Sequence, residues 1–503
     1  MLFFVYLYFL SILVLAVFGM QRTYMLRVLT KKRQENEDSV PDLSSPPELL
    51  DPPKVCVQLP VYNEPKVIER LLECVAKLEY PRDCLEIQVL DDSSDETSDL
   101  IDSFVQRLEF SDLTISVIRR SSRRGYKAGA MALGLEQTDA EFLAIFDADF
   151  TPTPDFLLQV MPCFKGRSDI AFVQTRWGYL NRERSVFTRA QAVLLDGHFV
   201  VEHAARYLTG AFFNFNGTAG VWRRDAIVDA GGWQGDTITE DLDLSYRAQL
   251  KGWRGHYLRD YICESELPES IDAFKSQQYR WTKGSIQTAR KLIPEILRSS
   301  DISLHQKVQA FFHLCSPACY LLGLLVVLLL VPVSAYRLEV YRVIGSWFEL
   351  CTFFMTLGSL FIFYFSSQNT RWQKPLDRSR SIFEVLTACV LGIGMSAHCA
   401  LGVLSGLRSK VGEFVRTPKT GVSESSSAVI FQAPGFKSAL RSAKSHAKES
   451  VVFLYLASGL SFLSYREHFL TVPFLILLLS GYALIVVLQF YGTGAYEKES
   501  LSR

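Results

Sequence analysis

Apolar runs at both ends of the chain enclose a long segment in which short apolar stretches alternate with polar residues. Residues 1–20 are almost entirely apolar and are followed by a basic stretch that begins at Arg22 and ends at Arg33. A helix needs about 20 apolar residues to cross a bilayer, and cytoplasmic flanks carry the excess of Lys and Arg. The pattern predicts a transmembrane anchor over residues 1–33 whose C-terminal side faces the cytoplasm.

The middle of the chain has the pattern of an α/β domain. Residues 34–53 are polar and rich in proline, which indicates a linker. After the linker, from Lys54 to about Ala140, short runs of β-branched and aliphatic residues alternate with helical periodicity, as in stacked βαβ units with a parallel sheet. This alternation predicts a cytoplasmic domain over residues 54–300. The strands expected in it cover 55–60, 85–90, 114–118, 141–146 and 170–174.

The last part of the chain, residues 301–503, is predicted to form a transmembrane helical bundle. If all its apolar runs cross, the basic loop at 406–449 lies across the membrane from the α/β domain, against the positive-inside rule. We therefore expect that the run at 382–406, which contains Glu384, His398 and several glycines, does not make one net crossing. An ordinary span is the alternative. The apolar runs cover 308–333, 347–366, 382–406, 450–465 and 470–491.

Composition agrees with a chain that is part soluble and part membrane-embedded. It is 49% hydrophobic and 21% charged, and its formal net charge is zero, so no global field attracts nucleic acid. The ten cysteines contain no C-x-x-C pair, which predicts neither a disulfide framework nor a zinc site. None of the eight histidines shows metal-ligand spacing, and none is assigned a role.

Polar clusters follow the first, second and fourth expected strands. In open α/β sheets, ligands bind at the carboxyl ends of the strands, so these clusters predict a site at one edge. Asp147 and Asp149 can hold a hard divalent cation such as Mg²⁺, with donor phosphates as further ligands. The alternative is that they are solvated turn acids. The clusters are Tyr62-Asn63-Glu64, Asp91-Asp92 and Asp147-Ala148-Asp149.

Three further stretches contain candidate chemistry with a structural alternative for each. Lys127, between two glycines, can bring an ammonium to a pyrophosphate, or can be an exposed residue at a helix start. Glu240 and Asp241 begin a helical pattern, where acids ordinarily stabilise the helix dipole, but a carboxylate there can also act as a general base. The run Asn216-Gly217-Thr218, preceded by aromatic residues, suits a sugar-binding trough or a core strand and turn.

Residues 277–281 lie at the junction of the two halves of the chain. Arg280 offers a fork of donors suited to phosphate oxygens, Gln277 offers an amide, and Trp281 offers a face on which a sugar ring can stack. The alternative is a juxtamembrane helix with an interfacial Trp and an Arg that reaches toward water.

In this order, the motifs resemble those of the processive family 2 glycosyltransferases, which include cellulose, mannan and hyaluronan synthases. The stretches at 217–222, 230–233 and 265–268 look most like the cellulose synthase-like mannan and glucan synthases. The resemblance implies a Rossmann-like α/β GT-A fold, a nucleotide diphosphate sugar as donor, and an inverting transfer. It also implies that the glycan passes through the enzyme's own membrane bundle.

The resemblance also implies roles for single residues. Asp241 would be the general base, with Glu240 beside it, and Mg²⁺ or Mn²⁺ would bind at Asp149 with Asp147. Asn216, Gly217, Thr218 and Trp281 would contact the acceptor. The donor would be held by Tyr62, Glu64 and Asp92 at the nucleoside, Lys127 at the pyrophosphate, Asp147, and Gln277 and Arg280 at the diphosphate leaving group.

One segment of the loop at 406–449 resembles the gating loop of cellulose synthases. Phe414, Thr417 and Lys419 match the F-x-V-T-x-K pattern, whereas Arg416 stands where Val is expected. Such a lid requires a cytoplasmic loop, which is a second reason to doubt a simple crossing at 382–406.

These patterns predict a membrane-integrated, processive β-glycan synthase. It would make a β-1,4-linked glucan or mannan from UDP-glucose or GDP-mannose, with a glycan acceptor, and would sit in a lipid bilayer. The alternatives are a non-processive enzyme that glucosylates a lipid, and a transporter or receptor with a nucleotide-binding domain. With no targeting extension in the sequence, a bacterial inner membrane is expected rather than a Golgi membrane.

Overall fold

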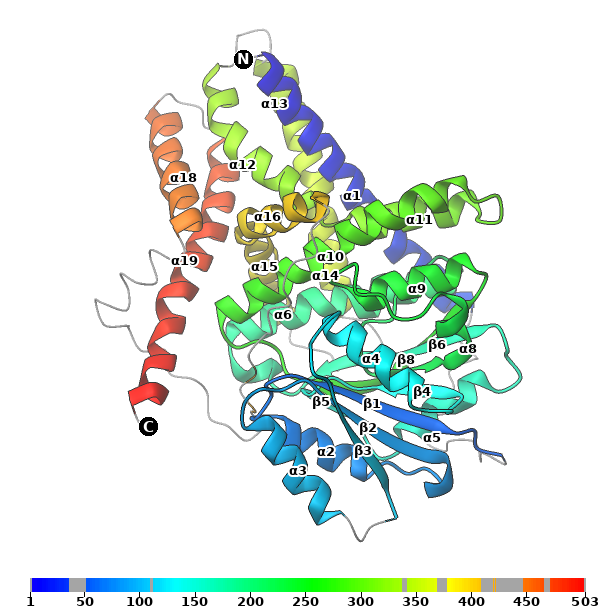
Figure 1. Ribbon diagram of the computed structural model, residues 1–503. Helices are drawn as coiled ribbons and strands as arrows, with labels where there is room; N and C mark the ends of the chain where they lie inside the picture. The colour runs from blue at the N-terminus through cyan, green and yellow to red at the C-terminus, as the bar shows by residue number, and fades with distance from the viewer. Residues whose placement is uncertain are drawn as a thin grey trace.

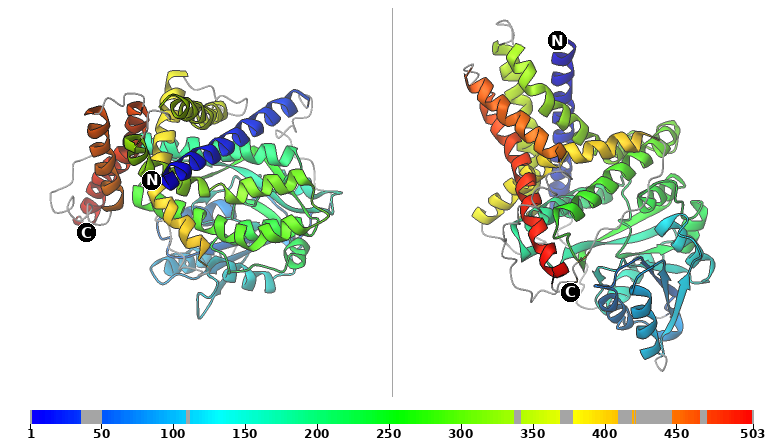
Figure 2. Two further views of the ribbon diagram at one scale, coloured as in Figure 1. Left: turned by 90° about the horizontal axis from the view of Figure 1, so that it is seen from above. Right: turned by 60° about the vertical axis from the view of Figure 1, so that its left-hand side comes forward.

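The computed structural model describes most of the chain. The described residues are 2–35, 51–108, 112–336, 342–368, 378–408, 419, 421, 447–465 and 471–501. Within them an α/β domain carries a group of long helices on one side (Figures 1 and 2). All ten cysteines lie in this part of the chain as free thiols.

The α/β domain is built on one mixed eight-stranded sheet with the order β3-β2-β1-β4-β7-β6-β8-β5. The first four strands in the chain are parallel, and β1, β2 and β4 are buried aliphatic runs, as is typical of parallel strands, whereas β3 is a partly exposed edge strand. The five expected strands, β1 to β4 and β6, run in the same direction, and the sheet is mixed because β7, a strand that was not expected, runs antiparallel to both β4 and β6. The strands are β1 (Val55–Val61), β2 (Leu85–Asp91), β3 (Thr114–Arg119), β4 (Phe142–Ile145), β5 (Phe150–Thr151), β6 (Ile170–Tyr179), β7 (Gly220–Arg223) and β8 (Arg254–Ser265).

Helices cover both faces of this sheet. Val55, Val57 and Leu59 alternate along β1 and are buried with α2 and α3, which lie away from the long apolar helices (Figure 1). Leu143 and Ile145 of β4 are buried in a second core with α4. The helices of the domain are α2 (Ile68–Ala76), α3 (Thr97–Arg107), α4 (Tyr126–Glu136), α5 (Phe156–Val160), α6 (Val186–Asp196), α7 (Ala204–Leu208), α8 (Arg224–Asp229) and α9 (Glu240–Leu250), with short η1 (Arg82–Cys84), η2 (Met161–Phe164), η3 (Arg182–Arg184) and the π-helical η4 (Gly197–His203).

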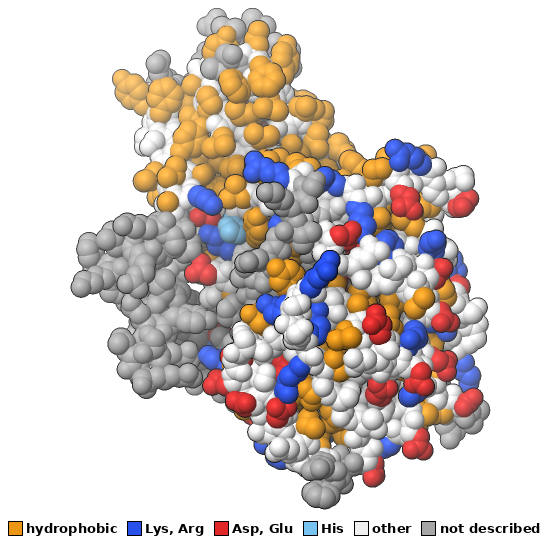
Figure 3. All heavy atoms as spheres, viewed as in Figure 1, with side chains coloured by type: hydrophobic (Ala, Val, Ile, Leu, Met, Phe, Trp, Pro, Cys, Tyr) orange, Lys and Arg blue, Asp and Glu red, His pale blue; other side chains and the backbone are white. Residues whose placement is uncertain are grey.

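Among the described residues, four helical segments are long and apolar enough to span a membrane: Leu2–Lys32, Ala318–Tyr336, Trp347–Gln368 and Val472–Gln489. Their surface is covered with apolar side chains, whereas charged side chains of both signs cover the α/β domain (Figure 3). Such a surface suits lipid. The helices are α1 (Leu2–Glu35), α12 (Ala318–Tyr336), α13 (Arg342–Phe353) continued by η6 (Phe354–Gly358) and α14 (Ser359–Gln368), and α19 (Val472–Leu501).

Two expected spans differ in the structure. The run at 308–333 is split, because α11 (Leu304–Cys315) ends before Pro317 and α12 begins after it. The run at 450–465 forms α18 (Ala447–Tyr465), which is not among the four apolar segments above.

The run at 382–406 is bent. It forms α15 (Arg378–Gly394) and α16 (Ser396–Leu407), which meet at an angle of 51° at Met395. This is the geometry of a broken span or a re-entrant segment. α16 packs on α10 (Ile271–Arg298), the 28-residue helix that joins the α/β domain to the membrane part.

Candidate active site

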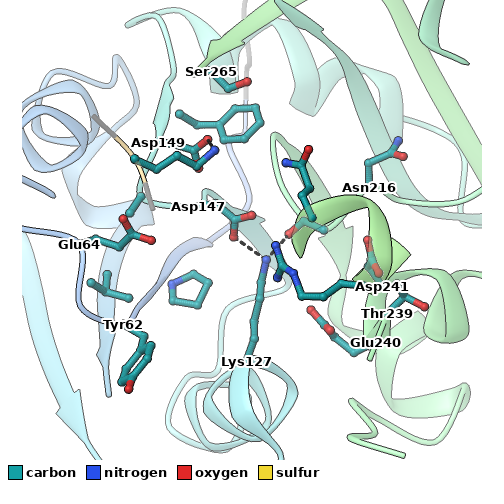
Figure 4. A pocket seen from close by; sticks show the side chains of 18 of the residues that line it. Tyr62, Glu64, Lys127, Asp147, Asp149, Asn216, Thr239, Glu240, Asp241 and Ser265 are labelled. Carbon is teal, nitrogen blue, oxygen red and sulfur yellow. Dashed lines mark hydrogen bonds and ion pairs between the residues drawn. The ribbon is translucent and has the colours of Figure 1, made fainter. Parts of the chain in front are cut away.

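A pocket opens at the carboxyl ends of β1, β2 and β4 and is closed on its other side by the start of α9 and by α10 (Figure 4). Parallel strands place their C-terminal loops at one edge, which is why the separate polar clusters meet there. The pocket is lined by nearly all residues to which the sequence assigns chemistry: Tyr62, Glu64, Asp92, Lys127, Asp147, Asp149, Asn216, Gly217, Glu240, Asp241, Gln277, Arg280, Trp281 and Lys419.

Hydrogen bonds between the β1 and β2 loops hold this edge of the pocket together. The backbone N–H of Asn63 donates to the Ser93 hydroxyl at 3.0 Å, and the N–H of Ser94 donates to Oδ1 of Asn63 at 2.8 Å. Asn63 has a φ of 54°, in the left-handed region that Asn tolerates better than most residues. The loops that carry Glu64 and Asp92 are thus fixed relative to each other.

Two arginines after β3 contact the expected nucleoside end of the pocket. Nε of Arg120 donates to Oδ1 of Asp92 at 2.9 Å. The guanidinium carbon of Arg123 lies 3.2 Å from the centre of the Tyr62 ring, in a cation–π contact. The sequence analysis missed both, although the run Arg119-Arg120-Ser121-Ser122-Arg123-Arg124 directly after an expected strand was the available signal.

Lys127 lies at the centre of the pocket. Its ammonium, from the first turn of α4, lies 2.5 Å from Oδ1 of Asp147 and donates to the Gly217 carbonyl at 2.9 Å (Figure 4). Burial alone would lower the pKa of Lys127, but the charges of Asp147 and Glu240 outweigh burial and raise it. Lys127 is therefore a fixed positive charge between the β-strand loops and α9.

Glu240, which is buried, and Asp241, which is half-buried, form an acidic pair at the N-terminus of α9. Burial raises the pKa of both carboxyl groups, and for Glu240 the charge of Asp241 raises it further, while Lys127 opposes the shift. A carboxylate whose pKa is raised is a better proton acceptor near neutral pH. Gly217 has a φ of 78°, and a Cβ there would lie 3.1 Å from Oδ2 of Asp241, so a glycine leaves this carboxylate room.

Thr218 does not line the pocket, in contrast to the expected acceptor contact. Its side chain is fully buried, and its hydroxyl accepts the backbone N–H of Asp147 at 2.8 Å. Phe213 and Phe215, which precede it, are buried in the core, and Thr218 lies behind the pocket wall. Thr218 therefore supports the strand end that carries Asp147.

Lys419, one of the two residues described between 409 and 446, lines the pocket. Its ammonium lies 2.5 Å from Oδ2 of Asp149 and donates to the Glu266 carbonyl at 3.0 Å. The Glu266 carboxylate accepts from the backbone of Gly421 at 3.2 Å and pairs with Arg70 at 2.7 Å. Phe414 and Thr417, the other two residues of the gating motif, lie outside the described residues.

The negative charges of Asp147 and Asp149 suit a divalent cation. Each carboxylate already holds a positive charge, Asp147 that of Lys127 and Asp149 that of Lys419. Across the described ranges, no group of three or more His, Cys, Asp or Glu side chains is placed to hold a metal. A cation at these aspartates would therefore need further ligands, such as phosphate oxygens or water.

α10 brings Gln277, Arg280 and Trp281 to the side of the pocket that faces the membrane helices. Close packing against α16 holds it there. A Cβ at Gly402 of α16 would lie 3.2 Å from the Tyr279 carbonyl, and one at Gly406 would lie 2.8 Å from the Lys283 carbonyl. Glycines four residues apart thus let α16 approach the backbone of α10.

Comparisons with known proteins agree with this geometry. Residues 52–284 match the family model described as "Glycosyltransferase like family 2". Glucomannan 4-beta-mannosyltransferase 1 of Oryza sativa subsp. japonica is 35% identical over 419 residues, which cover 80% of this chain and 77% of that protein. Probable glucomannan 4-beta-mannosyltransferase 1 of Arabidopsis thaliana is 35% identical over 381 residues, covering 73% and 66%. The chain is a family 2 glycosyltransferase.

Among solved structures, mannosyltransferase PcManGT from Pyrobaculum calidifontis, in complex with GDP-Man and Mn2+, is 18% identical with a TM-score of 0.48. The match covers 70% of this chain and 97% of that one. The family assignment confirms the resemblance inferred from the order of the motifs and the GT-A type of fold. These two curated relatives come from plants, so they give no support to the bacterial membrane expected from the sequence.

Proposed function

We propose that this glycosyltransferase extends a β-1,4-linked glycan by adding mannose from GDP-mannose. The observation that carries the proposal is the pocket in which Lys127, Asp241 and Arg280 converge beside the membrane helices. The relatives named as glucomannan 4-beta-mannosyltransferases favour mannose, with glucose from UDP-glucose as the second candidate. They do not favour a lipid acceptor.

Asp241 would act as the base that activates the acceptor hydroxyl. In an inverting transfer, a base removes the proton of the attacking hydroxyl while the donor's diphosphate leaves from the opposite face. Asp241 lies on the α9 side of the pocket, across from Glu64 and Asp149 (Figure 4). Trp281 provides an aromatic face for the terminal acceptor sugar.

The leaving diphosphate would be stabilised by the positive charges of the pocket. Arg280 and Lys127 place donors where negative charge develops, and Gln277 adds an amide. Mg²⁺ or Mn²⁺ held by Asp149 and Asp147 would supply further positive charge when bound. Because Lys419 and a divalent cation would hold the same Asp149 carboxylate, we expect them to compete for it.

The membrane helices offer a route for the product. A cavity of about 350 Å³ lies among α1, α12, α14, α15 and α19. α6 contributes to both walls, since Leu194 lines this cavity and Leu195 lines the active-site pocket. The cavity wall is mainly apolar with tyrosines such as Tyr8 and Tyr320, which suits the apolar faces of sugar rings. This route would place the α/β domain on the cytoplasmic side.

Product analysis tests the proposal. Full-length protein in nanodiscs is incubated with labelled GDP-mannose or UDP-glucose, and the products are sized and digested with β-mannanase or cellulase. A β-mannanase-sensitive polymer, lost in Asp241→Asn, is expected. A single sugar on a lipid would reject chain extension.

A further inference from the structure

A polar cluster joins the wall of the active-site pocket to the membrane cavity. Asn216 lines the pocket, and Arg22 of α1 lines the cavity. Between them, Nε2 of His198 lies 3.1 Å from Oδ1 of Asn216, and Nδ1 of His198 lies 3.6 Å from the Glu202 carboxylate. Glu202 in turn lies 3.6 Å from Nε of Arg22. The cluster therefore reaches from one space to the other.

A π-helical turn builds this cluster. α6 continues directly into η4, which contains His198, Glu202 and His203. A π-helical turn is wider than an α-helical turn and often occurs at functional sites. His203 also faces Asn216, since its Nε2 lies 3.1 Å from Nδ2 of that residue. Nε2 of His203 also donates to the Asn214 carbonyl at 2.9 Å, so His203 lies against both residues, whereas His198 contacts the Asn216 carboxamide.

Glu202 anchors the cluster as a charged group. Its carboxylate lies 3.4 Å from Arg206 and 3.6 Å from Arg22. Burial would raise the pKa of Glu202, but His198 and the two arginines outweigh burial and lower it. A half-buried carboxylate held between cations on α7 and α1 has little freedom to move, so it fixes the His198 ring.

Residues of the cluster contact the Asn216 carboxamide. Its Oδ1 is contacted by Nε2 of His198 at 3.1 Å and accepts from Nδ2 of Asn214 at 3.0 Å. The backbone N–H of Asn216 donates to Oε1 of Gln174 at 2.8 Å and holds the main chain of this residue. Because Asn214 donates to Oδ1, the oxygen of the carboxamide lies toward His198.

Asn216 stands on the same side of the pocket as Asp241, and its side chain points away from the Lys127–Asp147 pair (Figure 4). We infer that His198 is a positioning residue, which through Glu202 holds the Asn216 carboxamide for a hydroxyl of the acceptor sugar. The inference rests on the proposed function, because it names the acceptor side of that same pocket.

Two polar substitutions of His198 separate this role from a structural one. A glutamine amide reaches the place of Nε2 and can donate to Asn216, whereas an asparagine amide reaches only the place of Nδ1 and contacts Glu202. Both keep a polar group in the cluster. His256→Gln is the matched control, since His256 is also half-buried but contacts Tyr207 and Arg167, away from the pocket.

The assay measures KM for a manno-oligosaccharide acceptor, kcat, and GDP affinity in full-length protein. We expect His198→Asn to raise the acceptor KM about tenfold, the value of one ordinary hydrogen bond, with GDP affinity unchanged. His198→Gln should restore KM to within about twofold, and His256→Gln should leave it at the wild-type value.

An acceptor KM that is unchanged in His198→Asn, or equal in the Asn and Gln variants, would overturn the inference. A parallel loss of GDP affinity would also overturn it, because the role would then be structural. A wild-type protein that transfers no sugar to the oligosaccharide would instead overturn the proposed function.

Discussion

Replacing Thr218 tests whether this residue supports Asp147 from behind the pocket wall or contacts the acceptor sugar. The side chain is fully buried, and its hydroxyl is the partner of the Asp147 backbone N–H at 2.8 Å. Thr218→Val keeps the shape and removes the hydroxyl, so this N–H loses its partner in a buried place. An unsatisfied buried donor costs about 1–3 kcal/mol. Thr218→Ser keeps the hydroxyl and serves as the control.

In full-length protein, Thr218→Val should lower Tm by about 2–12 °C, since 1 kcal/mol shifts a domain of this size by about 2–4 °C. The strand end that carries Asp147 would also lose its fixed position, so donor affinity should fall while acceptor KM stays the same. Thr218→Ser should stay near wild type in Tm and donor affinity. A higher acceptor KM in Thr218→Val, with unchanged Tm and donor affinity, would refute this reasoning. It would indicate instead that Thr218 contacts the acceptor, as the sequence analysis expected.

Further predictions concern the base, the cation and the helix packing. Asp241→Asn should abolish transfer while isothermal titration still detects GDP; lost GDP binding would make the carboxylate structural. Because burial raises the pKa of Asp241 and only the deprotonated form accepts a proton, activity should fall on the acidic side at a higher pH than for an exposed aspartate, as a pH–rate profile will show. Lys419→Ala should tighten Mn²⁺ binding at Asp149, measured by titration; unchanged affinity would mean that the two cations do not compete. Gly402→Val should lower Tm by crowding the Tyr279 carbonyl, whereas an unchanged Tm would mean that α16 can shift at no cost.

The sequence predicts β1, β2 and β4 well because each strand can be recognised from a short stretch of neighbouring residues. Each of β1, β2 and β4 is a short aliphatic run followed by polar residues, and parallel pairing alone brings Glu64, Asp92 and Asp147 to one edge. β8 could not be predicted in this way. Its sequence mixes charged and aromatic residues, and its strand conformation depends on pairing with β6, which is distant in the chain.

The site shows the same difference between residues in short motifs and residues whose contacts form only in the fold. Lys127 and Asp241 were found because each stands in a short motif, although their roles stay predictions. Arg123 was missed because its contact with the Tyr62 ring joins two loops that meet only in the fold. Thr218 was misplaced because a polar residue next to Gly217 gives no sign in the sequence of which way its side chain faces.

The bond that the enzyme forms tests the central claim most directly. Full-length protein is given GDP-mannose labelled with ¹³C at C1 and a manno-oligosaccharide acceptor, and the product is examined by NMR. The account predicts a β-configured C1 linked to O4 of the former terminal sugar, because Asp241 activates that hydroxyl across the pocket from the leaving diphosphate. An α-configured C1, or label found only on a lipid, would contradict it.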